Sequence, residues 1–433
     1  MAHRGPAVTS RGQRSNEPAA AAFAPPAGAP ADPPRRVRRP GFALRRLVLV
    51  ETALAVGVAG CVHGGAAAAG SVVVAGLLAP FAVAPFTVTR RRGRAVPGRL
   101  PTALALRARR RDAAAVAPGT HPDWAPVAEA APGLAPYGYA DRGRRTVGMA
   151  GDGSFLTAVV RVEAGRESLR RAPGARAFPL SLLGDALTVD DIVLESAQLV
   201  QQVRPAPARQ SAARSSGVPP QERDGAPALR MTWVAVRLDP EACREAVEAR
   251  GGGLGGAQRC LVRVADQVAS RITGAGFRAS VLDQEELRAV LAAALCARAA
   301  VPPGGGHRDG ASGRRTAETP GAWRCDGRLH RSYVVDRWPG SGRGPAPLPR
   351  LVASLTRVPA YATTFCLTLR RGPYRAEVSV SGHVRVTGGS AAELAGACEA
   401  LEREARSARV GLVRLDREQL PGVLATVPLG GTR

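Results

Sequence analysis

Residues 231–249 read MTWVAVRLDPEACREAVEA and place a strand pattern directly before a helix pattern. Met231–Leu238 is a short apolar run rich in Val, Thr and Trp, which is typical of a strand. Asp239-Pro240-Glu241 then supplies a helix N-cap, a proline at the first helical position and an acid in the first turn. A strand followed at once by a helix over Glu241–Ala249 predicts a domain of the mixed α/β class.

Further helix and strand patterns follow and extend this main α/β domain over residues 230–430. Gly255–Thr273 carries an apolar stripe at helical spacing, which predicts an amphipathic helix. A Gly-rich loop is expected at 302–319. The remaining strands are expected at Phe277–Leu282, Leu329–Trp338, Thr363–Arg370, Tyr374–Val386 and Val410–Leu415, and the remaining helices at Gln284–Ala299, Leu351–Val358, Ala391–Ala405 and Arg417–Thr426.

Residues 146–203 form a first part of the same α/β region. Gly151-Asp152-Gly153 lies between the apolar runs Thr146–Ala150 and Ser154–Val162, which predicts a β-hairpin. Leu180–Leu187 is typical of a short helix and Ile192–Val203 of a strand. Residues 204–229 are rich in Pro, Ala, Ser and Arg and are expected to form a linker.

Two segments of the main domain resemble each other. Val281–Leu287 (VLDQEEL) and Arg414–Leu420 (RLDREQL) each follow a helix and a strand and open another helix. Asp283 with Glu286, and Asp416 with Gln419, both fit a capping box. The pattern indicates either a repeated strand–cap–helix unit in a two-lobed domain or two independent caps.

Arginine supplies all of the 60 basic side chains, since the sequence contains no lysine. Pyridoxal-phosphate chemistry and a Walker A nucleotide loop, which both need a lysine, are therefore excluded. The formal net charge of +25 is unevenly spread: residues 1–46 carry +7 and residues 90–112 carry +8. More than half of the excess charge thus brackets the region between these two stretches.

That region, residues 42–89, is expected to be a transmembrane helical hairpin with spans at about 43–62 and 66–88. The second run is long enough to cross a bilayer and contains no charge. The short loop between the runs makes the helices antiparallel, and the Arg-rich outer flanks place both termini in the cytoplasm. Residues 1–41 are expected to be a disordered cytoplasmic tail, and 90–145 a basic Pro/Ala connector whose arginines contact anionic lipid headgroups.

Two features inside the hairpin raise alternatives. Glu51 is an acid within the first span, which marks either a functional site or a partner for Arg46 or a neighbouring helix; we favour the partner interpretation. Val58–Cys61 resembles a lipoprotein cleavage box. A second apolar span follows it directly where a lipoprotein would have a polar tether, so we favour an uncleaved hairpin.

The sequence predicts no catalytic, cofactor-binding or metal-binding residue. Gly251–Gly256 joins two helices and does not follow a strand, so it is interpreted as a linker rather than a phosphate loop. Asp190-Asp191 resembles a glycosyltransferase metal dyad, but a strand directly follows, which favours a turn. The cysteines and histidines show no ligand spacing and are interpreted as core or surface residues: Cys61, Cys243, Cys260, Cys296, Cys325, Cys366 and Cys398, with His121, His307, His330 and His383.

A sequence pI of about 11.4 suggests nucleic-acid binding. The excess charge brackets the apolar runs, however, and no basic segment is interleaved with aromatic residues. Nucleic acid is therefore not expected as a partner. Trp233 and Trp338 are expected to be core residues, with a contact role as the alternative.

Several segments together resemble the EccE component of actinobacterial type VII (ESX) secretion systems. These are the early hairpin, Thr232–Pro240 (TWVAVRLDP), Ala246–Gly256 (AVEARGGGLGG), Gly276–Asp283 (GFRASVLD), Arg337-Trp338-Pro339 and Glu377–Gly388 (EVSVSGHVRVTG). The resemblance covers roughly residues 40–425 and excludes the tail and the 302–319 loop. It implies a non-enzymatic, two-pass subunit of the cell membrane that assembles with EccB, EccC and EccD components, with EccC as the ATPase.

Two other hypotheses remain open from the sequence alone. The first is a membrane-anchored, glycosyltransferase-like enzyme acting on a nucleotide-activated or lipid substrate, based on the α/β alternation and Asp190-Asp191. The second is a peripheral binder of DNA or anionic lipid, based on the arginine content.

Overall fold

The computed structural model describes residues 99–113, 116, 119–141, 145–164, 178–205, 228–298, 314–339, 348–372 and 377–431. The chain divides into two compact units, residues 26–113 and residues 1–25 with 114–433. The expected tail at 1–41 and hairpin at 42–89 lie outside the described residues. No helix within the described ranges is both long enough and apolar enough to cross a membrane.

The described part of the smaller unit is helix α3, Arg99–Arg111. Its last turn carries Arg109, Arg110 and Arg111. Positive side chains at this end of a helix interact favourably with its dipole.

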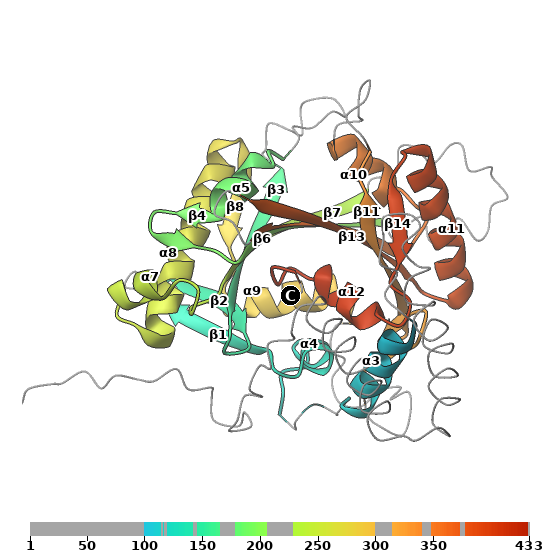
Figure 1. Ribbon diagram of the computed structural model, residues 1–433, viewed down its shortest axis with the longest axis horizontal. Coiled ribbons are helices and arrows are strands. Elements are labelled where there is room, and N and C mark those ends of the chain that lie inside the picture. The colour runs from blue at the N-terminus through green and yellow to red at the C-terminus, as the bar shows by residue number, and fades with distance from the viewer. Residues whose placement is uncertain are drawn as a thin grey trace, which may run out of the picture. The chain divides into compact units, whose positions relative to one another are not determined.

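The larger unit is built on one antiparallel sheet of 12 strands among the described residues (Figure 1). The strand order is β1-β2-β3-β7-β6-β12-β13-β11-β10-β9, with β8 beside β3 and β14 beside β11, while β4 and β5 form a separate small hairpin. The strands are β1 Ala135–Ala140, β2 Thr146–Gly151, β3 Leu156–Ala164, β4 Thr188–Val189, β5 Ile192–Val193, β6 Ser196–Pro205, β7 Ala228–Leu238, β8 Phe277–Val281, β9 Thr316–Glu318, β10 Trp323–Cys325, β11 Arg328–Arg337, β12 Ala362–Arg371, β13 Val378–Gly388 and β14 Gly411–Arg414.

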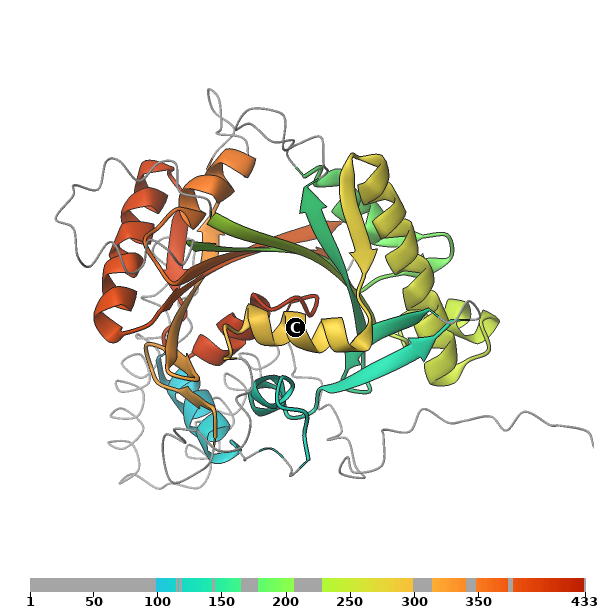
Figure 2. The same cartoon turned by 180° about the vertical axis from the view of Figure 1, so that it is seen from behind.

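Helices cover both faces of this sheet, so the strands are apolar on both sides. The side chains of Val234 and Val236 pack into the core cluster shared with α8, α10 and α11, whereas Trp233 and Ala235 pack into the cluster shared with α9 and α12. Figure 2 shows the sheet curving around α9 and α12. The helices are α4 Ala125–Ala130, α5 Ser181–Ala186, α7 Arg244–Ala249, α8 Gly253–Gly274, α9 Gln284–Ala294, α10 Leu348–Thr356, α11 Ala391–Ser407 and α12 Gln419–Ala425.

The two halves of the larger unit repeat one topology. Apart from β4, β5 and α7, which have no counterpart, the order β1-β2-β3-α5-β6-β7-α8-β8-α9 is matched by β9-β10-β11-α10-β12-β13-α11-β14-α12. The sheet order is mirrored about the β6–β12 pair, and β8 joins β3 as β14 joins β11. The resemblance between the two strand–helix segments therefore reflects a repeated unit, and the two repeats share one continuous sheet.

Only the first of the two expected capping boxes is confirmed. The Asp283 carboxylate accepts from the backbone N–H of Glu286 at 2.8 Å, and the Glu286 carboxylate accepts from the N–H of Asp283 at 3.1 Å. The second was wrong: α12 has no side-chain cap, and Gln419 is buried instead. Its Oε1 accepts from the N–H of Ser332 at 2.9 Å, so it satisfies a strand backbone rather than a helix end.

Several expected boundaries differ in the structure. The expected connector at 90–145 contains α3, α4 and β1, and β1 pairs with β2, so the sheet begins before Thr146. Likewise β9 lies within the expected 302–319 loop, and the expected strand Ile192–Val203 is split into β5 and β6. The division between 146–203 and 230–430 does not separate domains, because β6 pairs with both β7 and β12.

Two helix ends also differ from those expected from the sequence. The Asp239 carboxylate accepts from the N–H of Glu241 at 3.0 Å in a turn, and α7 begins only at Arg244. Helix α9 ends at Ala294 rather than Ala299, and Cys296 follows in the left-handed region at φ 53°. A local turn thus precedes α7, whereas α9 ends where Gln202 and Arg385 bind its last carbonyl.

Candidate functional site

A layer of buried polar side chains lies on the sheet face that packs against α9 and α12. It centres on the β6–β12 pair, where Val200 is opposite Cys366. On either side of that pair, Gln202 is opposite Thr364 and Gln198 is opposite Thr368. All four polar side chains are buried. Each Gln–Thr pair lies at the C-terminal end of one helix, so the two halves of the layer correspond to the two repeats.

The C-terminus of α9 is held by donors from the sheet. The Gln202 Nε2 donates to the Ala294 carbonyl at 3.3 Å, and Arg385 donates to the same carbonyl. Arg204 donates to the Ala293 carbonyl. The final carbonyls of a helix have no intrahelical partner and carry partial negative charge, so they attract such donors.

Arg385 is fully buried, and burial lowers the pKa of its guanidinium. Its Nη2 also reaches Thr364 Oγ1 at 3.3 Å, while its Nε and Nη1 have no hydrogen-bond partner among the described residues. A buried cation without an acidic partner is destabilising unless dipoles compensate it. The C-terminal carbonyl of α9 supplies that compensation here.

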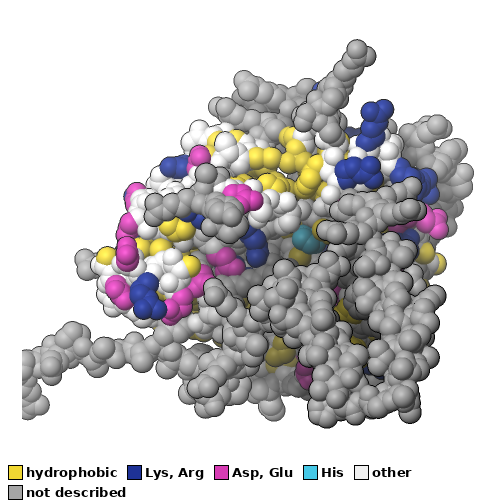
Figure 3. Space-filling model, viewed as in Figure 1, with side chains coloured by type: hydrophobic (Ala, Val, Ile, Leu, Met, Phe, Trp, Pro, Cys, Tyr) yellow, Lys and Arg dark blue, Asp and Glu magenta, His cyan; other side chains and the backbone are white. Residues whose placement is uncertain are grey.

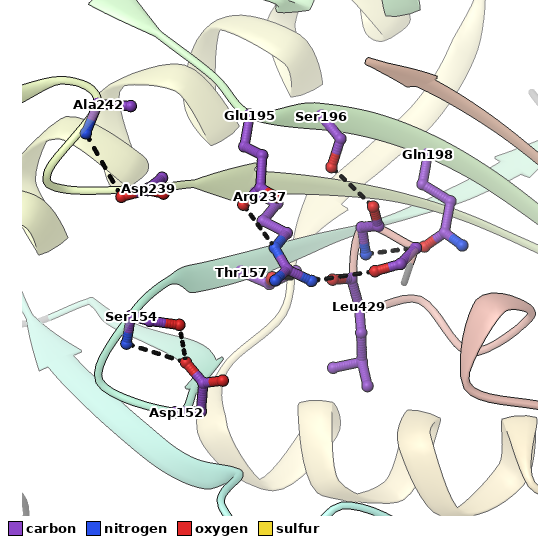
Figure 4. Close-up of polar contacts among 12 residues, drawn as sticks. Asp152, Ser154, Thr157, Glu195, Ser196, Gln198, Arg237, Asp239, Ala242 and Leu429 are labelled. Atoms are coloured by element: carbon purple, nitrogen blue, oxygen red, sulfur yellow. Dashed lines mark hydrogen bonds and ion pairs between the residues drawn. The ribbon is translucent and has the colours of Figure 1, made fainter. Parts of the chain in front are cut away.

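The C-terminus of α12 and the segment after it are held on the other side, and Figure 4 shows the contacts of that segment. Gln198 donates through Nε2 to the Ala425 carbonyl at 2.8 Å and accepts through Oε1 from the N–H of Gly430 at 2.9 Å. Ser196 Oγ donates to the Gly430 carbonyl at 2.7 Å, and Thr157 Oγ1 donates to the Leu429 carbonyl at 3.1 Å. Residues 429–430 thus find side-chain partners for their backbone groups.

Arg237 completes this second half of the layer. Its Nη1 donates to the Gly431 carbonyl at 3.0 Å, and its Nε donates to Glu195 Oε2 at 2.9 Å. The guanidinium also lies 3.5 Å from the centroid of the Phe155 ring. The paired charge and the ring contact stabilise this arginine in a mostly buried position.

The histidines of the sheet are uncharged at neutral pH. His330 is fully buried, and burial, with Arg385 and other arginines nearby, holds its pKa well below 6.5. Its Nδ1 lies 3.0 Å from Thr387 Oγ1, and its ring contacts that of Trp323. Burial lowers the pKa of His383 to about 4. His121 is exposed near Glu285, at 3.9 Å, and His307 lies outside the described residues.

The six cysteines within the described residues are free and buried. Burial raises the pKa of the Cys260 and Cys366 thiols to about 11 and raises that of Cys325 further. Such thiols stay protonated at neutral pH and are poor nucleophiles and metal ligands. Across the described ranges, no group of three or more His, Cys, Asp or Glu residues is arranged to hold a metal ion.

Asp190 and Asp191 form the turn between β4 and β5, as the sequence predicted, with Asp190 at φ 54°. Each carboxylate is bound by an arginine. Asp191 forms two hydrogen bonds of 2.7 Å with Arg250, which lower the pKa of its carboxyl, and Asp190 accepts from Arg263 at 3.0 Å. The arrangement fixes the small hairpin to α7 and α8.

The Gly251–Gly256 stretch joins α7 to α8, as expected, and its last four residues form the first turn of α8. Gly251, Gly252 and Gly253 have φ values of 93°, 69° and 56°. A Cβ at Gly256 would lie 2.4 Å from the Val247 carbonyl oxygen. The glycines therefore permit a tight turn and a close approach of the two helices.

Trp233 is a core residue, as expected, and Trp338 is partly buried with its ring against Gly382. Glu51 and Val58–Cys61 lie outside the described residues. Sequence reasoning missed the buried polar layer altogether. A signal for it exists in β6, where the polar residues Ser196, Gln198, Gln202 and Arg204 occur at even spacing.

The polar layer and the strands around it lie partly within a segment that matches a known family. Residues 226–335, from β7 into β11, match the family model described as "Putative type VII ESX secretion system translocon, EccE". The matches support membership of the EccE family. A 56-residue segment is 41% identical to ESX-1 secretion system protein EccE1 of Mycobacterium tuberculosis, in both strain CDC 1551 / Oshkosh and strain ATCC 25618 / H37Rv.

That identity covers 13% of this chain and 12% of the length of each relative. The family is a component of the type VII secretion system. The resemblance to the EccE family noted in the sequence is thus supported over residues 226–335.

Proposed function

We propose that the chain is a structural membrane subunit of a type VII protein secretion complex, where it stabilises the assembly of the inner-membrane channel without catalysing a reaction. The EccE family match is the observation that carries this proposal. Partners of the EccB, EccC and EccD type follow from the same family. A two-pass anchor over residues 42–89, with both termini in the cytoplasm, is part of the proposal.

The described side chains fit a scaffold better than an enzyme. The polar layer joins sheet residues to helix ends, and Gln198, Gln202 and Arg204 each donate to a backbone carbonyl at the end of α9 or α12. The thiols with raised pKa values, such as Cys366, are buried. The glycosyltransferase-like alternative would need Asp190 and Asp191 as metal ligands, but arginines already bind both carboxylates.

The basic flank supports a membrane position. In α3, Leu104 is 63% exposed, and Arg107 and Arg111 are exposed at helical spacing from it. An apolar side chain flanked by arginines suits the boundary between anionic headgroups and acyl chains. We therefore include anionic lipid as a partner of α3, immediately after the proposed hairpin.

Co-purification tests the proposed function directly. The full chain, tagged and expressed in its native membrane, is extracted in a mild detergent, and the recovered proteins are quantified by mass spectrometry. An equally tagged, unrelated two-pass membrane protein serves as control. Enrichment of the other type VII secretion components over that control is expected; recovery of none of them would refute the proposal.

The topology has its own test. In a chain with Cys61→Ser, a cysteine introduced by Gly64→Cys should react with an impermeant maleimide in intact cells. His121→Cys should react only after the cells are opened. The reverse pattern would contradict the orientation inferred from the arginine flanks.

A further inference from the structure

The β12–β13 hairpin extends past the strand that flanks it. Gly382 of β13 pairs with Val335, the last β11 residue to face β13 in register. Val378 to Ser381 continue to pair with β12, from Arg371 to Thr368. On their other side no strand of the described sheet pairs with them. Four residues of β13 therefore present an open edge.

This edge is apolar on one face. Val378 and Val380 alternate with serines and are 46% and 52% exposed. They share the strand face of Val384 and Val386, which are buried in the core cluster containing α10 and α11. Figure 3 shows hydrophobic side chains at the surface in the region between α5 and α10. The edge thus continues the buried core surface into solvent.

The other border strands of the sheet carry features that discourage further pairing. Arg278 lies in β8, Arg414 in β14 and Glu318 in β9, and β1 contains Pro136. Charged residues and proline are the usual protection of an exposed edge. The sequence Val378-Ser379-Val380-Ser381 has neither, which is expected where an edge is occupied in the working assembly.

We propose that this β13 edge receives an extended segment of another subunit of the secretion complex, which adds a strand to the sheet. The inference rests on the proposed function. The segment would place alternating apolar residues over Val378 and Val380 and acidic residues near Arg337, which is exposed just beyond the last β11–β13 pair. Backbone hydrogen bonds would supply affinity, and the alternating side chains would supply specificity.

A second copy of this chain fits the edge less well. Four residues bury far less surface than the roughly 1,200 Å² that a stable interface needs, so the added strand must belong to a partner held by other contacts as well. The chain also carries a net charge of +25, so two copies repel each other. An acidic segment would be attracted to this positively charged chain, whereas a second copy would be repelled by it.

Substitution at the edge provides the test. Val380→Lys places a charge on the open strand and, because the side chain is half exposed, should leave the thermal unfolding of the full chain unchanged. Val413→Lys is the matched control, since Val413 is 40% exposed on the border strand β14. Val380→Lys should reduce recovery of one secretion component at least about tenfold in mild detergent, and Val413→Lys should not.

Two further measurements identify the occupant. Amide exchange at residues 378–381 should be about tenfold slower in the assembled complex than in the isolated full chain, with 411–414 unchanged. A photo-crosslinking residue at Ser379, in native membranes, should link to an extended, acid-flanked segment of a different protein. A crosslink to this same chain, or no crosslink and no slowed exchange, would overturn the proposal.

Failure of the inference is distinguishable from failure of the proposed function. If the wild-type chain recovers the secretion components and Val380→Lys recovers them equally, the edge is not the contact although the function stands. If the wild-type chain recovers none, the proposed function is refuted and the proposed partner with it. A Ser379 crosslink to an extended segment of another protein would then still show that the β13 edge is a docking site, and no crosslink would refute that too.

Discussion

Gly430→Ala is expected to release the segment after α12 from the polar layer. Gly430 has φ 81°, and a Cβ there would lie 2.6 Å from Arg237 Cβ and 3.0 Å from Ser196 Oγ. Neither atom is at the far end of a long flexible side chain, so the segment must move. Its backbone hydrogen bonds with Ser196 and Gln198 would be lost with it.

The size of the effect follows from these contacts. An alanine in the left-handed region costs about 1 kcal/mol, and each of the two lost hydrogen bonds contributes about 1 kcal/mol. A total of about 3 kcal/mol corresponds to a fall of about 5 °C in the thermal midpoint for a domain of this size. The assay is thermal unfolding of the full chain in detergent, followed by fluorescence or circular dichroism.

Gly396→Ala is the matched control. Gly396 lies within α11, and nothing lies within 4 Å of the Cβ that the substitution adds. Replacing a helical glycine with alanine stabilises by about 0.5–1 kcal/mol, so the midpoint should rise slightly. If Gly430→Ala left the midpoint unchanged or raised it as Gly396→Ala does, the segment would not be held as described.

Three further predictions concern the caps and the buried polar groups. Asp283→Ala should destabilise the chain by about 1 kcal/mol because it removes the α9 capping box, whereas Asp416→Ala should not, since α12 has no side-chain cap; thermal midpoints compare them, and equal losses would contradict the difference. His383 binds its proton near pH 6.5 when unfolded but only at about pH 4 when folded, so stability should fall as pH drops through this window, by about 2 kcal/mol between pH 6.5 and 5 for this residue. His383→Gln should reduce the slope of midpoint against pH, and an unchanged slope would assign the pH dependence to other groups. Arg385→Met should leave the midpoint unchanged or higher, because Gln202 still donates to Ala294, while Arg385→Ala should lower it by leaving a cavity; a similar loss in both would show that the guanidinium itself is required.

The elements could be predicted wherever their signal was local. The Gly151-Asp152-Gly153 hairpin, the strand at Met231–Leu238 and the box at Asp283 all depend on neighbouring residues. Gln419 could not be placed this way, because its partner is the backbone of Ser332 in a strand distant in sequence. The same spacing of residues therefore gave a cap at one helix and a buried tertiary contact at the other.

The sheet itself depends on contacts that no local pattern encodes. Local alternation predicted β6 and β7 approximately, but not that β6 would pair with β12 and so join both halves into one sheet. The similarity of VLDQEEL and RLDREQL was a weak sign of that repeat. The repeat itself is defined by the equivalent positions of β8 and β14 beside β3 and β11.

The buried arginines change what the high net charge means. Because the chain contains no lysine, each position that needs a cation uses arginine, including buried positions such as Arg237 and Arg385. These side chains are engaged with a carboxylate or with helix carbonyls, as Arg237 is with Glu195 and Arg385 with Ala294. They contribute to the formal charge but not to a surface that a polyanion could reach. Most of the formal excess belongs to the stretches 1–46 and 90–112, which the proposed function places beside anionic lipid rather than nucleic acid.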